Sequence, residues 1–330
     1  MDIISLFSGA GGLDLGFENA NFNVIWANEY DKNIWETYKI NHKNTFLDTR
    51  SITDIKAIDL PNNINGIIGG PPCQSWSLAG SMRGIDDPRG KLFYDYLRLL
   101  KEKQPYFFVA ENVQGMLSPT HIGAFNEIRN EFEKCGYKVK YSLLNVWDYG
   151  VPQDRKRVIL VGYRNDLNIE FNFNNLIKTK KKLVLKDAIS DLPNPLPALD
   201  KNKANKDTGS FMNNEYFIGG FSSIFMSRNR IRKWDEPSFT IQASGRQAPI
   251  YPGSDPMIKV EANKWKFSGE NYRRLSVREC ARIQTFPDNF KFIYDKVDMG
   301  YKMIGNAVPV KFAEIIAKQI MKDLNEIGVE

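Results

Sequence analysis

The sequence of 330 residues contains few cysteines and histidines, the side chains that most often bind zinc. Its three cysteines, Cys73, Cys135 and Cys280, are odd in number, far apart and without a CxxC pair. This pattern argues against a disulfide framework and against a structural zinc site. Because His42 and His121 are the only histidines, zinc hydrolysis and histidine-based general base catalysis are poorly supplied. We therefore expect no bound metal.

Long hydrophobic runs are also missing. No uninterrupted apolar stretch approaches the roughly 20 residues that a membrane helix requires. The first residues, MDIISLFSGAGG, lack the basic start of a signal peptide. With 42% hydrophobic residues the chain can still bury a sizeable core. We expect a soluble, cytoplasmic protein with no membrane partner.

An excess of positive over negative charge is absent everywhere except in one segment. Residues 163–290 contain 21 lysines and arginines against 14 acidic residues, whereas the remainder contains 24 against 25. A basic excess confined to one segment is expected where that segment contacts a polyanion. The alternative is a basic surface that only contacts solvent.

Short apolar runs alternate with helical patterns over the first 165 residues. A repeated strand–helix–strand order predicts an α/β fold with a doubly wound, mostly parallel sheet and helices on both faces. The expected strands are residues 2–7, 23–29, 64–70, 105–112 and 157–163, and the clearest helices are 91–103, 124–136 and 311–328. From about 164 to 272 the chain is polar and proline-rich, with brief strand-like pieces such as 237–243, which predicts a smaller, irregular second domain. A helical pattern returns over 271–290.

A glycine-rich turn follows the first expected strand. Gly9, Gly11 and Gly12 lie where the chain turns into a helix, so the backbone can approach a ligand closely. Glu29 ends the next expected strand, where a carboxylate can accept hydrogen bonds from ribose hydroxyls. These residues indicate an adenosine-containing cofactor, either NAD or S-adenosylmethionine. The alternative is a turn that only packs a helix on a strand.

Polar side chains and a cysteine lie at or near the ends of three further expected strands. Cys73, in GGPPCQSWS, lies just beyond the strand 64–70 on a segment that prolines stiffen, as a nucleophile should. The alternative for a cysteine is a small buried apolar residue. Glu111 ends the strand 105–112, and Arg155 and Arg157 precede the strand 157–163. Two arginines separated by one residue point the same way in an extended chain, so we expect one shared site.

These motifs resemble a known family. FSGAGG, Glu29, PPCQSWS, ENV, QDRKR, RRLSVRECARIQTFPD and GNAVPV occur in the order of the DNA cytosine-C5 methyltransferases, and the resemblance extends from residue 2 to about 320. It implies the S-adenosylmethionine-dependent methyltransferase fold with a smaller DNA-recognition domain. The implied catalytic and cofactor-binding domain comprises residues 1–165 and 291–330, and the target-recognition domain comprises 166–290.

The resemblance also implies a mechanism. Cys73 would add to C6 of a flipped-out cytosine, and the methyl group would pass from S-adenosylmethionine to C5. Glu111 would hold a proton at N3, and Arg157 would hydrogen-bond the cytosine carbonyl. Arg155 would support Glu111 or contact a DNA phosphate.

A set of residues is implied to bind S-adenosyl-L-methionine, with Phe7 and Tyr30 against the adenine, Glu29 on the ribose and Asp48 at the adenine amino group. The full set is Phe7, Gly9, Ala10, Gly11, Gly12, Leu13, Glu29, Tyr30, Asp48, Thr49, Pro71, Asn306 and Val308. Asn306 and Val308, in GNAVPV, would return from the C-terminus to complete the pocket.

The expected partner is double-stranded DNA. Arg83 and Arg89 lie in a loop, from Ser75 to about Lys91, that resembles the lid closing behind the flipped base. Arg228, Arg230 and Arg246 suit the O6 and N7 atoms of guanine. The stretch around them resembles the HaeIII-type enzymes, which implies the inner cytosine of GGCC as the target.

Several alternative functions stay open, and the resemblance also implies partners. The same chemistry on another short duplex or on tRNA is the main alternative, followed by a catalytically silent DNA-binding relative. A nicotinamide-dependent oxidoreductase would leave the PPCQ and ENV motifs unexplained. We expect a bacterial monomer acting at the nucleoid, paired with a restriction endonuclease that acts on the same site without a stable complex.

Overall fold

The computed structural model describes residues 1–71, 88–209 and 211–329. It divides into two compact units, which are described here one at a time. Unit 1 comprises Met1–Asn145, Lys156–Ile177 and Val310–Glu330, and unit 2 comprises Val146–Arg155 and Lys178–Pro309. The expected domain division differs from these units, because residues 146–155 and 291–309 group with unit 2 and residues 166–177 group with unit 1.

Unit 1 is built on a seven-stranded sheet within the described residues, in the order β3-β2-β1-β4-β5-β7-β6. Neighbours from β3 to β5 pair in parallel, whereas β7 is antiparallel to both β5 and β6. The strands are β1 (Asp2–Leu6), β2 (Asn23–Asn28), β3 (Phe46–Asp48), β4 (Gly66–Gly69), β5 (Phe107–Val113), β6 (Tyr137–Asn145) and β7 (Lys156–Arg164). The five expected strands are confirmed, as is the mostly parallel α/β fold.

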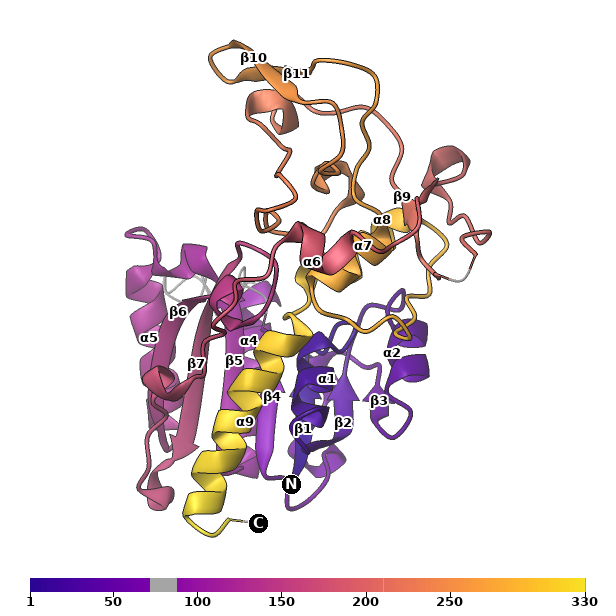
Figure 1. Cartoon of the computed structure of the whole chain (residues 1–330). Helices are drawn as coiled ribbons and strands as arrows, with labels where there is room; N and C mark the ends of the chain where they lie inside the picture. The colour runs from indigo at the N-terminus through magenta and orange to yellow at the C-terminus, as the bar shows by residue number, and fades with distance from the viewer. Residues whose placement is uncertain (72–87, 210, 330) are drawn as a thin grey trace. The chain divides into compact units, whose positions relative to one another are not determined.

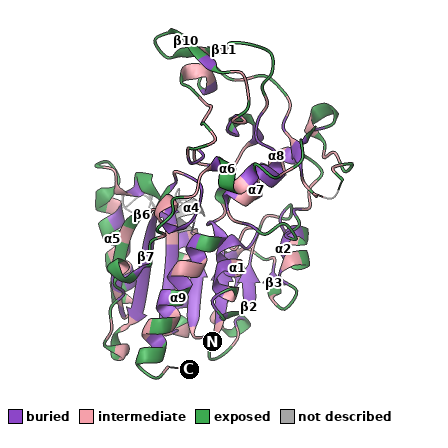
Figure 2. Cartoon of the chain, viewed as in Figure 1, coloured by how far each residue is buried: buried purple, intermediate pink, exposed green. Residues whose placement is uncertain are grey.

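Helices cover both faces of this sheet. The helices of unit 1 are α1 (Gly12–Glu18), α2 (Trp35–Asn41), α4 (Pro88–Lys103), α5 (Ile122–Lys134) and α9 (Val310–Glu326). Apolar residues of α4 and α5 form one buried cluster with alternate residues of the central strands, among them Phe93, Phe132 and Phe108. On the other face α1 and α9 lie in front of the sheet in Figure 1, and Phe17 of α1 stacks on Phe107 of β5. The central strands are therefore buried on both sides, as Figure 2 shows.

Unit 2 contains shorter elements joined by long irregular segments. They are α6 (Leu185–Ile189), α7 (Val277–Ile283), α8 (Val297–Asn306), β8 (Leu196–Pro197), β9 (Glu215–Tyr216), β10 (Met257–Glu261) and β11 (Lys264–Phe267). The expected strand over 237–243 is wrong, because its only pairing in the structure is an isolated bridge at Ser238. The helical pattern over 271–290 yields α7 alone, which Ser276 caps through a capping box with Glu279. In Figure 2 the β10–β11 hairpin is largely exposed.

A search of the described residues for membrane spans finds no helix that combines the required length and apolar character.

The contact between α1 and α9 leads to a stability prediction. A Cβ atom on Gly16 would lie 2.3 Å from Cβ of Ala313 and 2.7 Å from the main-chain oxygen of Val310. Gly16→Ala should therefore force the two helices apart and lower the free energy of unfolding by about 1–3 kcal/mol. Thermal unfolding followed by circular dichroism measures the change.

Gly123→Ala, in helix α5, is the matched control. A Cβ at this position would meet no atom of the described residues within 4 Å. This variant should be neutral or slightly stabilising, since alanine favours a helix over glycine. Equal stability of the two variants would contradict the tight packing of α1 on α9.

Candidate active site

The candidate site lies at the carboxyl ends of β1, β4 and β5. The chain leaves β1 toward β2 and β3 on one side and later returns to β4 on the other side, so β1 and β4 flank the switch point of the sheet. Ligands of open α/β sheets bind at such a point. Gly69 ends β4, and a Cβ there would lie 2.3 Å from the main-chain oxygen of Leu6 in β1, so only glycine allows the two strands to approach so closely.

The turn after β1 has an unusual backbone. Phe7, Gly9 and Gly11 adopt left-handed conformations with φ of 55°, 56° and 85°. Such a conformation costs little for glycine but is uncommon for a residue such as phenylalanine. A Cβ on Gly9 would meet no atom of the described residues within 4 Å, so the turn borders space that these residues leave open. The expected glycine turn is thus present, and it is strained at Phe7. Ala10, Gly12 and Leu13, which complete it, are buried.

Glu29 follows β2 and fixes this turn. Its Oε2 accepts a hydrogen bond of 2.9 Å from the N–H of Gly9, and its Oε1 accepts one of 2.7 Å from the N–H of Asp31. The indole N–H of Trp35, at the start of α2, donates to the main-chain oxygen of Glu29 at 2.8 Å. The carboxylate therefore lies beside the glycine turn, as the sequence predicts. Its contact with a ribose stays a prediction.

Asp48 ends β3, next to β2, and is paired with Arg50. The guanidinium of Arg50 bonds both carboxylate oxygens of Asp48, with the shortest contact at 2.6 Å. Burial disfavours the charged form, but the hydrogen bonds and charge of Arg50 prevail and lower the pKa of Asp48. The adenine amino group expected at Asp48 would have to bond the same carboxylate oxygens that the Arg50 guanidinium already bonds. Tyr30 is 72% exposed, which leaves its ring available for stacking, and Thr49 is half-buried.

Glu111 and Arg157 form an ion pair between β5 and β7. Arg157 Nε lies 2.8 Å from Glu111 Oε1, and each side chain is only 12% exposed. The pair follows from the antiparallel register, in which Glu111 lies opposite Ile159 and Val113 lies opposite Arg157. A Cβ on Gly70 would lie 3.3 Å from Glu111 Oε2, so the carboxylate lies over the chain that leaves β4. The acid is thus held beside the segment that leads to Cys73.

Asn112, which the sequence reasoning missed, supports the same segment. Its buried side-chain amide donates to the main-chain oxygen of Pro71 at 2.9 Å, and its Oδ1 accepts from the N–H of Val113 at 2.8 Å. Asn112 therefore fixes the start of the proline segment relative to β5. The ENV motif contains this residue, but its spacing alone did not show which group the amide would bind.

Arg155 occupies a different environment from Arg157. It belongs to unit 2, is 1% exposed, and donates to the main-chain oxygens of Ile241, Gly305 and Ala307 at 2.9–3.1 Å. Because β7 begins only at Lys156, the expectation that both arginines point the same way is wrong. A buried guanidinium that bonds carbonyl groups disfavours a contact with a DNA phosphate. The expected support of Glu111 by Arg155 stays a prediction.

Other expected residues lie in unit 2 or outside the described part of the chain. Asn306 is exposed at the end of α8 and Val308 is buried, both within unit 2. Cys73 and Arg83 lie outside the described residues, and Arg89 lies in the first turn of α4, where only the backbone is described.

The expected DNA-reading arginines differ in exposure. Arg228 and Arg246 are exposed. Arg230 instead donates to the main-chain oxygens of Phe225 and Ile224 at 2.7 and 2.9 Å and covers the Phe225 ring. Burial lowers the pKa of Arg230. Its side chain is thus partly committed within unit 2.

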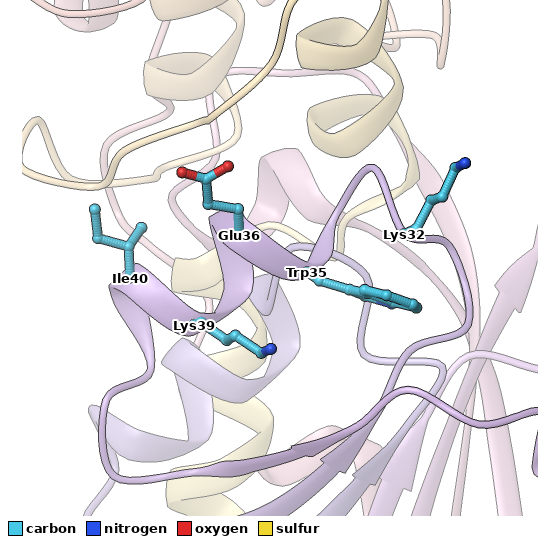
Figure 3. Close-up of a pocket in the computed structure, with 5 residues that line it drawn as sticks. All are labelled: Lys32, Trp35, Glu36, Lys39 and Ile40. Atoms are coloured by element: carbon cyan, nitrogen blue, oxygen red, sulfur yellow. The ribbon is translucent and has the colours of Figure 1, made fainter.

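A surface groove of about 500 Å³ lies along α2. Figure 3 shows Trp35 and Lys32 near one end of it and Glu36 and Ile40 pointing away from the strands. None of these residues was expected in the site, and Trp35 contacts an expected site residue through the main-chain oxygen of Glu29.

The sheet and its glycine turn are those of the S-adenosylmethionine-dependent methyltransferase fold. A crystal structure described as a DNA modification methyltransferase encoded within a prophage (E. coli) matches this chain with a TM-score of 0.75 at 27% identity, covering 98% of this chain and 99% of that chain. The profile of the C-5 cytosine-specific DNA methylases matches residues 1–322. The chain belongs to this family, and it is a cytosine-C5 DNA methyltransferase.

Relatives named as type II methyltransferases match over nearly the whole chain. Type II methyltransferase M.FnuDI of Fusobacterium nucleatum is 58% identical, covering 99% of this chain and 96% of the relative. Type II methyltransferase M.MthTI of Methanothermobacter thermautotrophicus is 56% identical, covering 99% of both chains. The resemblance inferred from the sequence motifs is therefore confirmed at the level of the family.

The contact between Asn112 and Pro71 leads to a second prediction. Asn112→Ala removes a buried donor and leaves the Pro71 carbonyl without this partner, so the free energy of unfolding should fall by about 1–3 kcal/mol. Methyl transfer should also fall, because the segment leading to Cys73 loses a fixed point. Thermal unfolding and a methyl-transfer assay measure the two effects.

Gln114→Ala, two residues further along and exposed, is the matched control and should change stability by no more than about 0.5 kcal/mol. If Asn112→Ala behaved like this control, the side-chain amide would not fix the segment.

Proposed function

We propose that this chain is the modification enzyme of a type II restriction-modification system. It methylates C5 of the inner cytosine of GGCC in double-stranded DNA, with S-adenosyl-L-methionine as the methyl donor. The observation that carries the proposal is the Glu111–Arg157 pair over Gly70, next to the left-handed turn at the switch point. This arrangement provides a carboxylate and a guanidinium for a pyrimidine beside a turn suited to a nucleoside.

The residues at the turn fit S-adenosylmethionine. Gly9 has a left-handed backbone and open space where a Cβ would lie, so a ligand can approach its main chain. Glu29 presents a carboxylate at the end of β2 for the ribose, and the exposed Tyr30 offers an aromatic face for the adenine. When bound, S-adenosylmethionine supplies an electrophilic methyl group on a sulfonium.

Cys73 is the proposed nucleophile. Its thiolate electron pair forms a bond to C6 of the cytosine, and the C5–C6 π electrons become available at C5 for methylation. After methylation a base removes the C5 proton, the C5–H electrons restore the double bond, and the thiolate leaves. Glu111 holds the proton at N3 so that no negative charge builds up on the ring, and Arg157 donates to the cytosine carbonyl.

The basic segment of unit 2 is proposed to read the DNA. The exposed Arg228 and Arg246 are placed to reach guanine O6 and N7, for which a bidentate arginine is the commonest specific contact. Arg230 can contribute only if DNA binding releases it from Phe225. GGCC has two adjacent G·C pairs in each half-site, and a segment with several arginines could contact the guanines of such a site. Arg83 and Arg89 are proposed to contact phosphates from the loop beyond Cys73.

The biological setting is proposed from the named relatives, which are type II methyltransferases from a bacterium and an archaeon. A partner endonuclease would cut the same site without a stable complex. We propose a cytoplasmic monomer acting on nucleoid DNA, because a base-flipping enzyme needs one copy per target.

The nucleophile can be tested by covalent trapping. With S-adenosylmethionine present, a duplex with 5-fluorocytosine at the target should become attached to the wild-type protein, since after methylation the fluorine at C5 cannot be removed as a proton can and the thiolate cannot leave. Cys73→Ser should form no adduct and lose turnover while still binding DNA. Mass spectrometry of the digested complex identifies the modified residue.

Cys135→Ser is the matched control and should trap DNA normally, because burial raises the pKa of the Cys135 thiol and disfavours its thiolate. If the duplex still became attached to Cys73→Ser, the assignment of Cys73 as the nucleophile would be wrong.

The target can be tested by bisulfite sequencing of DNA from cells that express the chain. Methylation is expected at the inner cytosine of GGCC, and Arg228→Ala should weaken discrimination at one guanine by about 1–3 kcal/mol. Methylation confined to another site would overturn the GGCC assignment and leave the chemistry intact. If DNA and tRNA were offered in parallel and only tRNA were methylated, the proposed DNA substrate would be wrong.

A further inference from the structure

A buried polar cluster lies beneath the glycine turn, away from the groups that the mechanism uses. Asp14 of α1 is fully buried and accepts hydrogen bonds of 2.6 Å from the hydroxyls of both Ser5 in β1 and Tyr38 in α2. His42, which follows α2, stacks on the Tyr38 ring with 4.5 Å between ring centres. Its Nδ1 lies 3.2 Å from a carboxylate oxygen of Glu18, at the end of α1.

The other edge of the His42 ring lies against the glycine turn itself. A Cβ on Gly11 would lie 2.0 Å from Nε2 of His42 and under 3 Å from both adjoining ring carbons. The ring therefore fills the space in which a side chain at position 11 would lie, and the left-handed Gly11 packs directly on it. Because the ring is fully buried, the turn cannot move toward it without displacing Tyr38 and Glu18.

The surroundings of His42 favour its protonated form. Burial alone would lower the pKa of His42, but the hydrogen bond to Glu18, the charges of Asp14 and Glu18, and the main chain of Ala10 together raise it. The titratable groups that face the ring are Asp14 and Glu18 from α1 and Tyr38 from α2. Burial raises the pKa of Tyr38 well above 10, so Tyr38 keeps its proton at neutral and mildly alkaline pH.

We propose that His42 is a positioning residue for the methyl-donor site, whose protonated ring holds the Gly9–Gly12 turn in its binding conformation. This inference rests on the proposed function, because it takes the turn to be the S-adenosylmethionine site. A neutral imidazole has one donor and one acceptor nitrogen, whereas a protonated one donates from both. Either form can donate to the Glu18 carboxylate, but only the protonated ring adds an ionic attraction to Glu18 and Asp14, which holds the ring in place against Gly11.

The inference gives the donor affinity a defined pH dependence. The folded-state pKa of His42 is raised above the usual 6.5, so its contribution to the turn is complete below pH 6.5 and is lost as pH rises through the folded-state pKa. By linkage, bound S-adenosylmethionine should raise the pKa of His42 further. Both effects can be measured without DNA, and therefore without turnover.

The experiment joins calorimetry with NMR. Isothermal titration of the full chain with S-adenosylmethionine gives Kd at a series of pH values, and NMR of histidine-labelled protein follows the two rings, His42 and His121, separately. We expect Kd to increase at least about fivefold as His42 loses its proton, and the His42 signal to titrate at higher pH when the donor is bound. His42→Gln should bind at least about fivefold more weakly than wild type at pH 6.5 and show no such pH dependence. Its KM for the donor should rise while kcat at saturating donor stays near wild type.

Two further variants keep the test decisive. Glu18→Gln retains the ring but removes a carboxylate that holds its proton, so the midpoint of the pH dependence should move to lower pH. His121→Gln, which changes the other histidine, in an exposed position, should behave as wild type. Any pH dependence that remains in His42→Gln belongs to the donor's own amino group and is subtracted.

The outcomes separate the inference from the proposed function. If wild type failed to bind S-adenosylmethionine at any pH, the proposed donor site would be wrong. If wild type bound it and folded His42→Gln bound equally well with the same pH profile, the positioning role of His42 would be overturned. If His42→Gln did not fold, an unchanged midpoint in Glu18→Gln, or a His42 signal indifferent to the donor, would overturn it in the same way.

Discussion

The candidate site depends on a backbone constraint, namely the left-handed turn that follows β1. A non-glycine residue such as Phe7 adopts this conformation at a cost of about 1–2 kcal/mol, which the surrounding contacts must offset. Two contacts hold the turn. Glu29 accepts the N–H of Gly9, and the buried His42 ring packs on Gly11. Parallel pairing of β1 with β2 brings Glu29 to this turn, so sheet register and turn geometry support each other.

The sequence predicted the parts of this site that depend on local pattern. Alternating strand and helix periodicity located β1, β2, β4, β5 and β7, and the glycines with Glu29 located the turn. It could not predict contacts that depend on where a strand begins. Arg155 and Arg157 are two residues apart, but β7 starts between them, so one guanidinium pairs with Glu111 and the other is buried among carbonyl groups. Asn112 and His42 were missed for a related reason, since residue type does not identify a partner distant in sequence.

Charge counting identified the basic segment but overstated how much of it can contact DNA. Arg274 and Arg278 are buried and donate to main-chain oxygens, and burial lowers the pKa of both. Arg273 is paired with Glu279 at 2.7 Å. Arginine is well suited to this structural role in a loop-rich unit, because its five donors can satisfy several carbonyl groups that no regular element pairs. The exposed arginines, such as Arg228 and Arg246, are therefore better candidates for base contacts than the buried ones.

The two halves of the candidate site achieve order by different physical means. At the glycine turn, a strained backbone is held by hydrogen bonds and packing. Between β5 and β7, Glu111 and Arg157 orient each other across adjacent strands, and Arg157 is further fixed by a 2.8 Å bond to the main-chain oxygen of Lys156. Because both side chains are largely shielded from water, their orientation is established on folding. Such preorganisation is most effective when both partners belong to rigid elements, and β5 and β7 meet that condition because they pair along seven residues.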